Sequence, residues 1–331
     1  MKKNLTVLAW TASVMLVLCM VFAGCKDNKK KSKADKDDDE TELAEDMDDD
    51  EDMYESEDQN GHTFDVRNAR EFLLALKDDA HINVIVSEPL QLTPALNVLI
   101  DEGEVSPYMV DGVAQTAPGL YWMPEYDGNT LYIVGLENIT IEGTSGDKGF
   151  LMTTPRYSDV LRFEQCRNIT IKNMILGHEE AGDCEGDVLV LRGCKNVTVE
   201  KCDLFGCGCI GIYCSKSQNI TVSRSDIYGC SMRGLEIFDT KNMSFKNCSI
   251  YNNAGGIYLD EKSRNISLSD CNLYDNRGQL FMCYSELQVK GSQVEHHCGD
   301  ESDNVTFTNC DVVMDYRDTD DLPDVEPDYY E

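Results

Sequence analysis

The chain has 331 residues, 41% of them hydrophobic, and its 61 acidic and 29 basic side chains give a formal net charge of −32. This length is enough for one large domain or two ordinary ones with a substantial core. The acidic balance excludes a general nucleic-acid binder, because phosphate would be repelled. Much of the charge lies near the ends: residues 35–58 contain sixteen acids and one Lys, and residues 311–331 contain nine acids and one Arg. The total charge therefore says little about the folded body.

The N-terminus has the pattern of an export signal. Lys2 and Lys3 precede an apolar run over residues 5–22, which ends in Ala23-Gly24-Cys25. This order predicts a secretory signal peptide over residues 1–24. A transmembrane anchor is the alternative, since the run approaches a spanning length, but the polar residues directly after Cys25 favour cleavage. Residues 22–25 resemble the lipobox of bacterial lipoproteins, which implies that Cys25 is diacylated and attaches the chain to a membrane of the cell envelope.

Residues 25–61 are predicted to form a disordered charged tether. A Lys-rich block at 29–33 is followed by acidic runs at 37–40 and 48–52, with few large apolar residues. Like charges repel, so such a segment stays extended; loose calcium binding is a second interpretation of the acidic runs. The Lys-then-acidic order also resembles the surface-export signals of lipoproteins in some Gram-negative bacteria. This resemblance implies an outer-membrane protein that is exposed at the cell surface.

A sequence repeat indicates a solenoid. Asn-led alternating runs begin at Asn196, Asn219, Asn242 and Asn265, in steps of 23 residues, with further copies at Asn138, Asn168 and Asn304 and a degenerate copy at 287–289. Each run is followed by two more short alternating runs with no helix between them. Three short strands per repeat favour a parallel β-helix over leucine-rich repeats or propeller blades. We therefore predict an all-β chain in which residues 62–315 form a single-stranded parallel β-helix solenoid, followed by an acidic tail over 316–331.

The segment before the repeats predicts a helical cap. Asn68 and Glu71 have the spacing of a capping box, and the residues up to Leu76 have an amphipathic face. Together with the repeats, this start resembles the right-handed parallel β-helix family, the pectin-lyase-like superfamily, over about residues 62–315. The resemblance implies right-handed coils, an N-terminal capping helix and a ligand groove on the outward face of one sheet. It does not imply a particular function.

Alignment of the repeats predicts the outward side chains of the third strand in each coil. One column contains Arg162, Val190, Tyr213, Glu236, Tyr258 and Phe281, and its neighbour contains Glu164, Arg192, Ser215, Phe238, Asp260 and Cys283. Aromatic rings beside charged groups suit sugar rings and uronates. The candidate carbohydrate-binding residues are therefore Tyr213, Phe238, Tyr258 and Phe281, with Trp122 from an excursion over residues 98–130. The alternative is structural, because aromatic ladders and Arg–Glu pairs also stabilise sheets and Trp122 can close a small core.

Catalysis is the second functional hypothesis. The resemblance implies that a polysaccharide lyase would use Arg162 or Arg192 as the base that removes a proton beside a uronate carboxylate, which requires a greatly lowered pKa. A glycoside hydrolase would use Glu236 and Asp260 on adjacent coils, with carboxyls about 6–10 Å apart, as inverting enzymes require. No catalytic motif of the superfamily is complete in this sequence.

An acidic loop over residues 178–187 is the candidate calcium site, and no other cofactor is indicated. Glu179, Glu180, Asp183 and Asp187 offer the carboxylate oxygens that calcium prefers. Their spacing is not that of an EF-hand, and a solvated loop is the favoured interpretation.

The cysteines are numerous but are not predicted to form a complete set of disulfides. Of 15 Cys, two are expected to be lost with the signal peptide or lipidated, which leaves an odd number. A predicted interior column contains Cys202, Cys248, Cys271 and Cys310, where a thiol acts as a small hydrophobe. Cys166 and Cys194, at equivalent positions of consecutive coils, are the best disulfide candidates.

These patterns lead us to expect a lipid-anchored envelope protein with a β-helical body. Its outward face is expected to bind a carbohydrate or another surface partner, and nucleic acid is not an expected partner. A polysaccharide lyase or glycoside hydrolase acting on a uronate-containing glycan is the alternative.

Overall fold

The computed structural model describes residues 55–58, 61–144, 146–179, 185–206, 208–260, 262–276, 281–283, 286–290 and 303–312. All of them belong to one compact unit, Asp52–Glu331. The predicted signal peptide, Cys25, most of the predicted tether and the acidic tail over 316–331 lie outside the described residues. Among the residues described, no helix is both long enough and apolar enough to cross a membrane.

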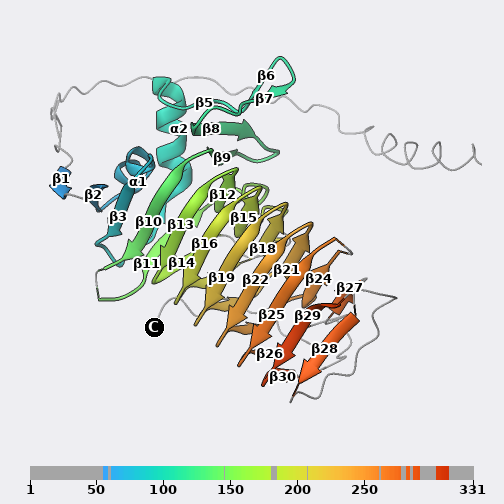
Figure 1. The fold of residues 1–331 in the computed structure, drawn as a ribbon. Coiled ribbons are helices and arrows are strands. Elements are labelled where there is room, and N and C mark those ends of the chain that lie inside the picture. Colours follow the sequence, from blue (N-terminus) through green and yellow to red (C-terminus); the bar gives the residue numbers. More distant parts are fainter. Residues whose placement is uncertain are drawn as a thin grey trace, which may run out of the picture. The chain divides into compact units, whose positions relative to one another are not determined.

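Three sheets wound by one chain form a parallel β-helix, in which each coil adds one strand to each sheet in turn (Figure 1). In spatial order, the first sheet consists of β1 (Glu55–Asp58), β2 (Gly61–Val66), β3 (Ala80–Val84), β10 (Glu137–Gly143), β13 (Arg167–Lys172), β16 (Lys195–Glu200), β19 (Gln218–Ser223), β22 (Lys241–Lys246), β25 (Arg264–Ser269), β29 (Asp303–Thr308) and β28 (Glu286–Lys290).

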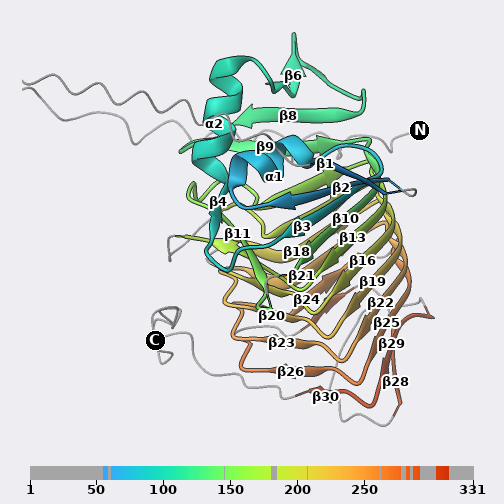
Figure 2. The ribbon, with the colours of Figure 1, turned by 90° about the vertical axis from the view of Figure 1, so that its left-hand side faces the viewer.

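The second and third sheets complete each coil, and Figure 2 shows the coils behind one another along the solenoid. The second sheet consists of β4 (Leu90–Gln91), β11 (Gly149–Thr153), β14 (Met174–His178), β17 (Asp203–Phe205), β20 (Asp226–Tyr228), β23 (Ser249–Tyr251), β26 (Asn272–Tyr274) and β30 (Asp311–Val312). The third consists of β5 (Ser106–Pro107), β8 (Gly119–Pro124), β9 (Asn129–Val134), β12 (Leu161–Glu164), β15 (Leu189–Arg192), β18 (Ile210–Ser215), β21 (Arg233–Phe238), β24 (Ile257–Leu259) and β27 (Phe281–Cys283).

The Asn that begins each repeat is a turn residue. Asn138, Asn168, Asn196, Asn219, Asn242 and Asn265 all have positive φ, between 55° and 61°. Asn tolerates this left-handed conformation better than most residues. From Asn168 onward, each side chain donates its amide hydrogen to the Asn of the preceding coil at 2.7–3.0 Å. The repeat therefore fixes both the turn and the stacking of successive coils.

The N-terminal end contains the predicted capping helix, α1 (Ala69–Ala75). The side chain of Asn68 accepts a hydrogen bond from the backbone N–H of Glu71 at 2.9 Å, as a capping box requires. A second helix that was not predicted, α2 (Leu92–Glu102), contacts α1. Strand β1 lies inside the segment predicted to be tether, so the ordered body begins earlier than residue 62.

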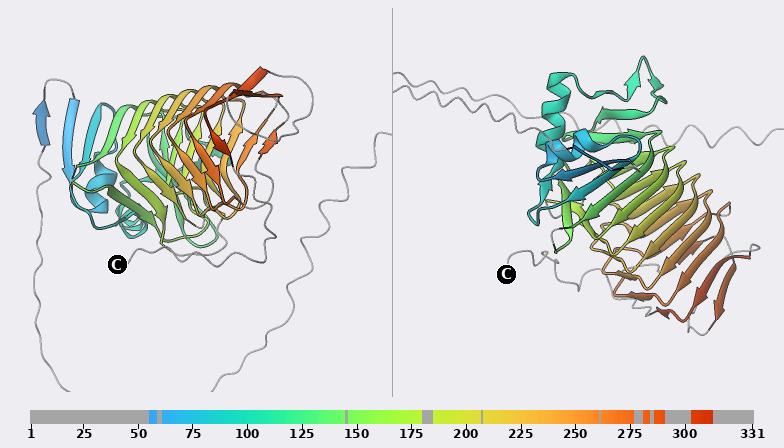
Figure 3. Two further views of the ribbon diagram at one scale, coloured as in Figure 1. Left: turned by 90° about the horizontal axis from the view of Figure 1, so that it is seen from below. Right: turned by 60° about the vertical axis from the view of Figure 1, so that its left-hand side comes forward.

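The predicted excursion over 98–130 is folded into the third sheet. After α2, a small hairpin forms from β6 (Met109–Val110) and β7 (Val113–Ala114). Strands β8 and β9 then pair antiparallel, and β9 joins the parallel strand β12. The excursion therefore supplies the N-terminal end of the third sheet, seen at the top in the right panel of Figure 3.

The last coils differ from the predicted order. Strand β29 pairs directly with β25, and β28 lies on the far side of β29. The copy at 287–289 is therefore not the neighbour of the coil before it. In the third sheet, Phe281 pairs with Ile257 and Met282 with Tyr258. This one-residue shift removes Phe281 from the outward column in which it was predicted, because Ile257 belongs to the buried inward column.

The core fills the space between the three sheets with aliphatic and aromatic side chains, among them Phe163, Phe245 and Phe307. Cys166 and Cys194 are buried free thiols, so the disulfide considered from the sequence is not formed between them. The predicted interior cysteine column is buried. Its thiols donate to backbone carbonyls; the Cys202 thiol, for example, lies 3.5 Å from the carbonyl of Ile171. The thiols therefore fill the interior of the turns and satisfy backbone acceptors there.

Candidate functional site

The outward face of the third sheet brings most of the predicted site residues together. The register places Arg162, Val190, Tyr213, Glu236 and Tyr258 in one column, and Glu164, Arg192, Ser215 and Phe238 in the next. Both columns agree with the sequence alignment over these coils. We call this surface the third-sheet face.

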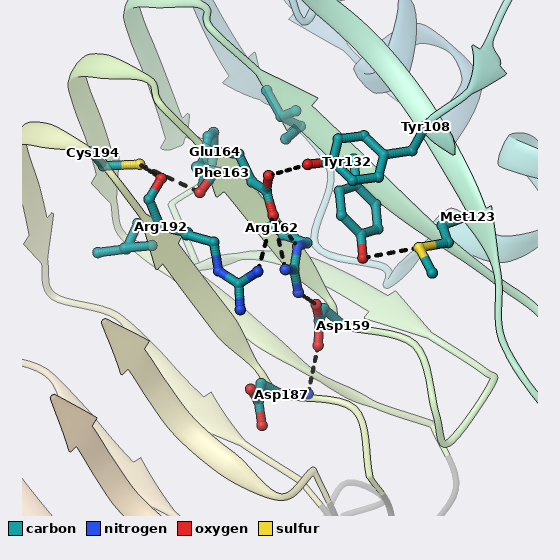
Figure 4. A network of polar contacts seen from close by, with 12 residues as sticks. Tyr108, Met123, Tyr132, Asp159, Arg162, Phe163, Glu164, Asp187, Arg192 and Cys194 are labelled. Atoms are coloured by element: carbon teal, nitrogen blue, oxygen red, sulfur yellow. Dashed lines mark hydrogen bonds and ion pairs between the residues drawn. The ribbon is translucent and has the colours of Figure 1, made fainter. Parts of the chain in front are cut away.

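Arg162 is at the centre of a buried polar network at the N-terminal end of this face (Figure 4). Its guanidinium group donates to Asp159 Oδ2 at 2.8 Å and to Glu164 Oε1 at 2.8 and 2.9 Å. The guanidinium carbon lies 4.4 Å from the centre of the Tyr132 ring. Only 13% of the Arg162 side chain is exposed. The group is therefore held on two sides by carboxylates and on a third by an aromatic ring.

Tyr108 closes the same network from the base of the β6–β7 hairpin. Its hydroxyl donates to Glu164 Oε2 at 2.5 Å, and its ring stacks on Tyr132 with the ring centres 4.1 Å apart. Burial and the hydrogen bond to Glu164 raise the pKa of Tyr108 to about 12, so the hydroxyl keeps its proton. Tyr108 was not among the predicted site residues, because it lies in the excursion and outside the repeat.

Arg162 does not have the properties of a base. Burial alone would lower its pKa, but Asp159, Tyr132 and Glu164 stabilise the charged form, and the pKa is raised above its ordinary value. A lyase base must instead lose its proton near neutral pH. The ion pairs and the raised pKa of Arg162 therefore favour a structural role over a base role.

Arg192 is the accessible guanidinium of the face. Its side chain is 49% exposed, and Nη1 lies 3.9 Å from Glu164 Oε1. The guanidinium carbon lies 5.9 Å from the centre of the Tyr213 ring on the next coil. Arg192 and Tyr213 therefore offer a cation and a ring side by side, and both are open to solvent at least in part.

An acid pair that the sequence analysis missed lies beside this network. Asp159 and Asp187 are at equivalent positions of consecutive coils, and the backbone N–H of Asp187 donates to Asp159 Oδ1 at 2.9 Å. Burial, followed by repulsion from Asp159 and Glu236, raises the pKa of Asp187 to about 8. Burial and these neighbours therefore favour the protonated form of Asp187. The pair could have been found from the sequence, because the triplet Asp-Val-Leu leads into the start of both β12 and β15.

Glu236 and Asp260, the predicted carboxylate pair, each have other partners in the structure. Asp260 accepts hydrogen bonds from the backbone N–H groups of Asp239 and Ser263 at 2.9–3.1 Å, and from the Ser263 hydroxyl at 2.7 Å. Its carboxylate therefore caps a turn. Glu236 is buried and forms an ion pair with Arg233. Glu236 also lies near Asp187, and its charge raises the pKa of that carboxyl.

Aromatic rings continue the face toward its C-terminal end. The ring centres of Tyr213 and Phe238 lie 5.6 Å apart at an angle of 40°, and those of Phe238 and Tyr258 lie 5.1 Å apart at 43°. The guanidinium carbon of Arg233 lies 5.4 Å from the centre of the Tyr258 ring. The rings are tilted against one another and half-buried, so they do not cover one another face to face.

Trp122 does not contribute to this aromatic row. It lies on β8, paired with Leu131 of β9, and packs against the main hydrophobic core. Packing against the core therefore fits Trp122 better than sugar binding, the other role considered from the sequence.

The candidate calcium residues are only partly described. Glu179 accepts a hydrogen bond from the Thr154 hydroxyl at 2.9 Å, Asp187 belongs to the acid pair, and Glu180 and Asp183 lie outside the described residues. No cluster of three or more His, Cys, Asp or Glu suited to a metal occurs within the described ranges. The nearby His178 is buried with its Nε2 atom 2.9 Å from the carbonyl of Ser158, and burial lowers its pKa.

Comparison with protein families identifies the architecture. A family model described as a right-handed β-helix region matches residues 159–313. The chain contains a right-handed parallel β-helix. This assignment confirms the predicted fold class, and the matched residues include strands β12 to β24 of the third-sheet face. Comparison with curated proteins found none that matches the sequence.

Solved structures with similar architecture include proteins that act on polysaccharides. A putative glycosyl hydrolase from Parabacteroides merdae is 13% identical, with 53% of this β-helix chain and 82% of that chain covered and a TM-score of 0.32. An alginate lyase from Paenibacillus sp. is 10% identical, with 76% and 99% covered and a TM-score of 0.36. The A-module of a mannuronan C-5 epimerase from Azotobacter vinelandii is 12% identical, with 77% and 89% covered and a TM-score of 0.38.

Proposed function

We propose that this chain is an envelope lipoprotein whose third-sheet face binds a polysaccharide. The observation that carries the proposal is the row of guanidinium groups and aromatic rings from Arg192 and Tyr213 to Arg233 and Tyr258. Ring faces suit the apolar faces of sugars, and guanidinium groups suit their hydroxyls and carboxylates. The coils repeat about every 4.8 Å, so the row extends along the solenoid and offers similar contacts to successive units of a linear polymer.

A variant pair tests the binding site. We would measure the binding of polygalacturonate, alginate and the neutral glucan laminarin by affinity electrophoresis. Arg192→Gln combined with Tyr213→Ala is expected to weaken binding of the glycan that the wild-type chain retains by at least about tenfold, since two direct contacts are lost. Tyr274→Ala on the second sheet is the matched control and is expected to leave binding unchanged. Equal losses in both variants, or no retention of any of the three glycans by the wild type, would contradict the proposal.

Glycoside hydrolysis is the second candidate function, and Asp187 is the observation that favours it. A carboxyl whose pKa is raised by burial suits a general acid, and the adjacent Glu236 would serve as the general base. Release of new reducing ends by the wild type, abolished by both Asp187→Asn and Glu236→Gln, would support this role. Products that absorb as unsaturated uronates would instead indicate a lyase, with Arg192 as the remaining base candidate.

We propose that a lipid anchor on Cys25 holds the chain in the cell envelope, at the outer membrane and exposed at the surface. It is supported by the sequence pattern of residues 1–25. Cells grown with labelled palmitate are expected to label the wild-type chain but not Cys25→Ala. Added protease is expected to digest the chain on intact cells. Labelling of Cys25→Ala would contradict the anchor, and protection from protease would place the body in the periplasm.

A further inference from the structure

A row of basic residues follows the edge between the third and first sheets, in a body that is otherwise acidic. Arg167, Lys195, Lys241 and Arg264 share one register column at the start of their first-sheet strands, with Gln218 between Lys195 and Lys241. Two further lysines lie two residues before this column, in the turns that enter β19 and β25. All six are exposed, and we call them the basic ridge: Arg167, Lys195, Lys216, Lys241, Lys262 and Arg264.

Most of this charge is not neutralised by neighbouring side chains. Arg167 forms an exposed ion pair with Glu137 at 3.4 Å. The four lysines of the ridge form no ion pair with another residue in the described part of the chain. Asp239 is an exposed acid in the same row of turns. The ridge therefore retains a clear positive charge, whereas residues 59–310 as a whole carry a net negative one.

The shape of the edge restricts what it can bind. Only two residues separate β12 from β13 and also β15 from β16, so the chain turns sharply from the third sheet to the first. The starts of the first-sheet strands lie along one convex edge of the solenoid (Figure 1). Four coil steps of about 4.8 Å separate Arg167 from Arg264, so the ridge is about 19 Å long. A convex edge cannot enclose a ligand as a concave site does, but it can lie along a flat surface.

We propose that the basic ridge docks the β-helix on an anionic lipid surface, with its Lys and Arg side chains at the phosphate groups of the lipid headgroups. Each Lys or Arg near such a surface strengthens binding by about fivefold. Because the body as a whole is acidic, docking through this edge would set the orientation of the solenoid on the surface. The lipid anchor of the proposed function would hold the ridge near a membrane, but docking is a separate property of the folded body.

The test compares two ends of the same two strands. Lys195 and Lys241 begin β16 and β22, and the exposed Lys201 and Lys246 lie at the other ends of these strands. The mature chain carrying Cys25→Ser, which receives no lipid, is mixed with vesicles containing 30% phosphatidylglycerol in phosphatidylcholine and sedimented. The double variant K195Q/K241Q is expected to bind about thirtyfold more weakly. The control K201Q/K246Q is expected to change binding by less than about threefold.

Several results would overturn the proposal. Equal losses in the two double variants would show that only net charge matters, and unchanged binding of K195Q/K241Q would exclude the ridge. Binding of soluble polyphosphate or polygalacturonate that depends on Lys195 and Lys241, without vesicle binding, would assign the ridge to a soluble polyanion. Because the chain lacks its lipid and no glycan is added to the vesicle assay, failure here leaves the glycan and palmitate tests of the proposed function to be decided separately.

Discussion

The second and third sheets both carry aromatic side chains on their outward faces, but the rings are arranged differently. On the second sheet, Tyr228, Tyr251 and Tyr274 stack with ring centres 4.9 Å apart and planes within 9° of parallel. Both ring faces of Tyr251 are therefore covered by the tyrosines of the neighbouring coils. On the third sheet, Tyr213 and Phe238 are tilted by 40°. Rings that cover one another stabilise the solenoid, whereas tilted rings leave surface for a ligand.

The outward faces of the second and third sheets also differ in the charged groups beside their aromatic rings. Guanidinium groups lie over the rings of Tyr132, Tyr213 and Tyr258 on the third sheet. Among the described residues, no cation lies over a ring of the second-sheet stack. An aromatic ladder read from sequence alone therefore does not distinguish a binding surface from a structural one. The ring planes and their charged neighbours make that distinction.

The largest expected effect concerns the two arginines of the third-sheet face. Arg162→Met leaves the carboxylates of Asp159 and Glu164 buried without their partner and is expected to lower the free energy of unfolding by about 3–5 kcal/mol. Arg192→Met removes an exposed group and is expected to cost less than about 1 kcal/mol. Urea unfolding followed by circular dichroism measures both. Similar losses for the two variants would contradict the division into a structural and an accessible arginine.

A second effect separates the two aromatic faces. Tyr251→Ala removes a ring that stacks on both neighbours, and we expect it to lower the free energy of unfolding by about 2 kcal/mol without altering glycan binding. Tyr213→Ala is expected to cost about 1 kcal/mol and to weaken glycan binding. The same unfolding and affinity measurements on both variants give the comparison. If Tyr251→Ala weakened binding more than Tyr213→Ala, the assignment of the two faces would be reversed.

The next effect is a dependence of stability on pH that arises from Asp187. Its pKa is raised to about 8 in the folded chain by burial and by Asp159 and Glu236, from an ordinary value of 3.8. Between these values the unfolded chain has lost the proton that the folded chain keeps, so stability falls as pH rises through this window. The variant Asp187→Asn has no titrating group at this position, so its stability does not fall with pH for this reason. We expect the variant and the wild type to be similarly stable at pH 4 and the variant to be more stable at pH 9.

Thermal unfolding at several pH values measures this difference. A stability gap between Asp187→Asn and the wild type that is the same at pH 4 and pH 9 would show that Asp187 titrates normally. That result would also remove the observation that favours the hydrolase.

The repeat made much of the fold predictable. A constant step of 23 residues between Asn196 and Asn265 fixes which residues are adjacent on neighbouring coils, and the alternation of each strand then fixes its inward and outward sides. The predicted strand pairing was wrong where the distance between repeats departs from 23 residues. After β25 the next first-sheet neighbour is β29 and not the nearer copy in β28, and Phe281 is shifted by one residue. Pairing across irregular connections depends on three-dimensional packing, which a repeat does not encode.

The sequence predicted which residues share the third-sheet face, but it did not predict which side chains contact one another there. The alignment placed Arg192 and Tyr213 on one face, as observed. It could not show that Asp260 caps a turn, that Arg162 is neutralised on two sides, or that Tyr108 reaches Glu164 from the excursion. Asp159 and Asp187 lie just before their strands, where the alternation used for the prediction has not yet begun. Local hydrogen bonds and burial decide these roles.

The most direct measurement of the central claim is a crystal structure of the chain with an oligosaccharide of whichever glycan it retains. If the third-sheet face binds the glycan, we expect sugar rings on this face, with one ring against Tyr213 and a hydroxyl or carboxylate at the guanidinium group of Arg192. Sugar bound along Tyr228, Tyr251 and Tyr274 of the second sheet, with the third-sheet face empty, would contradict it.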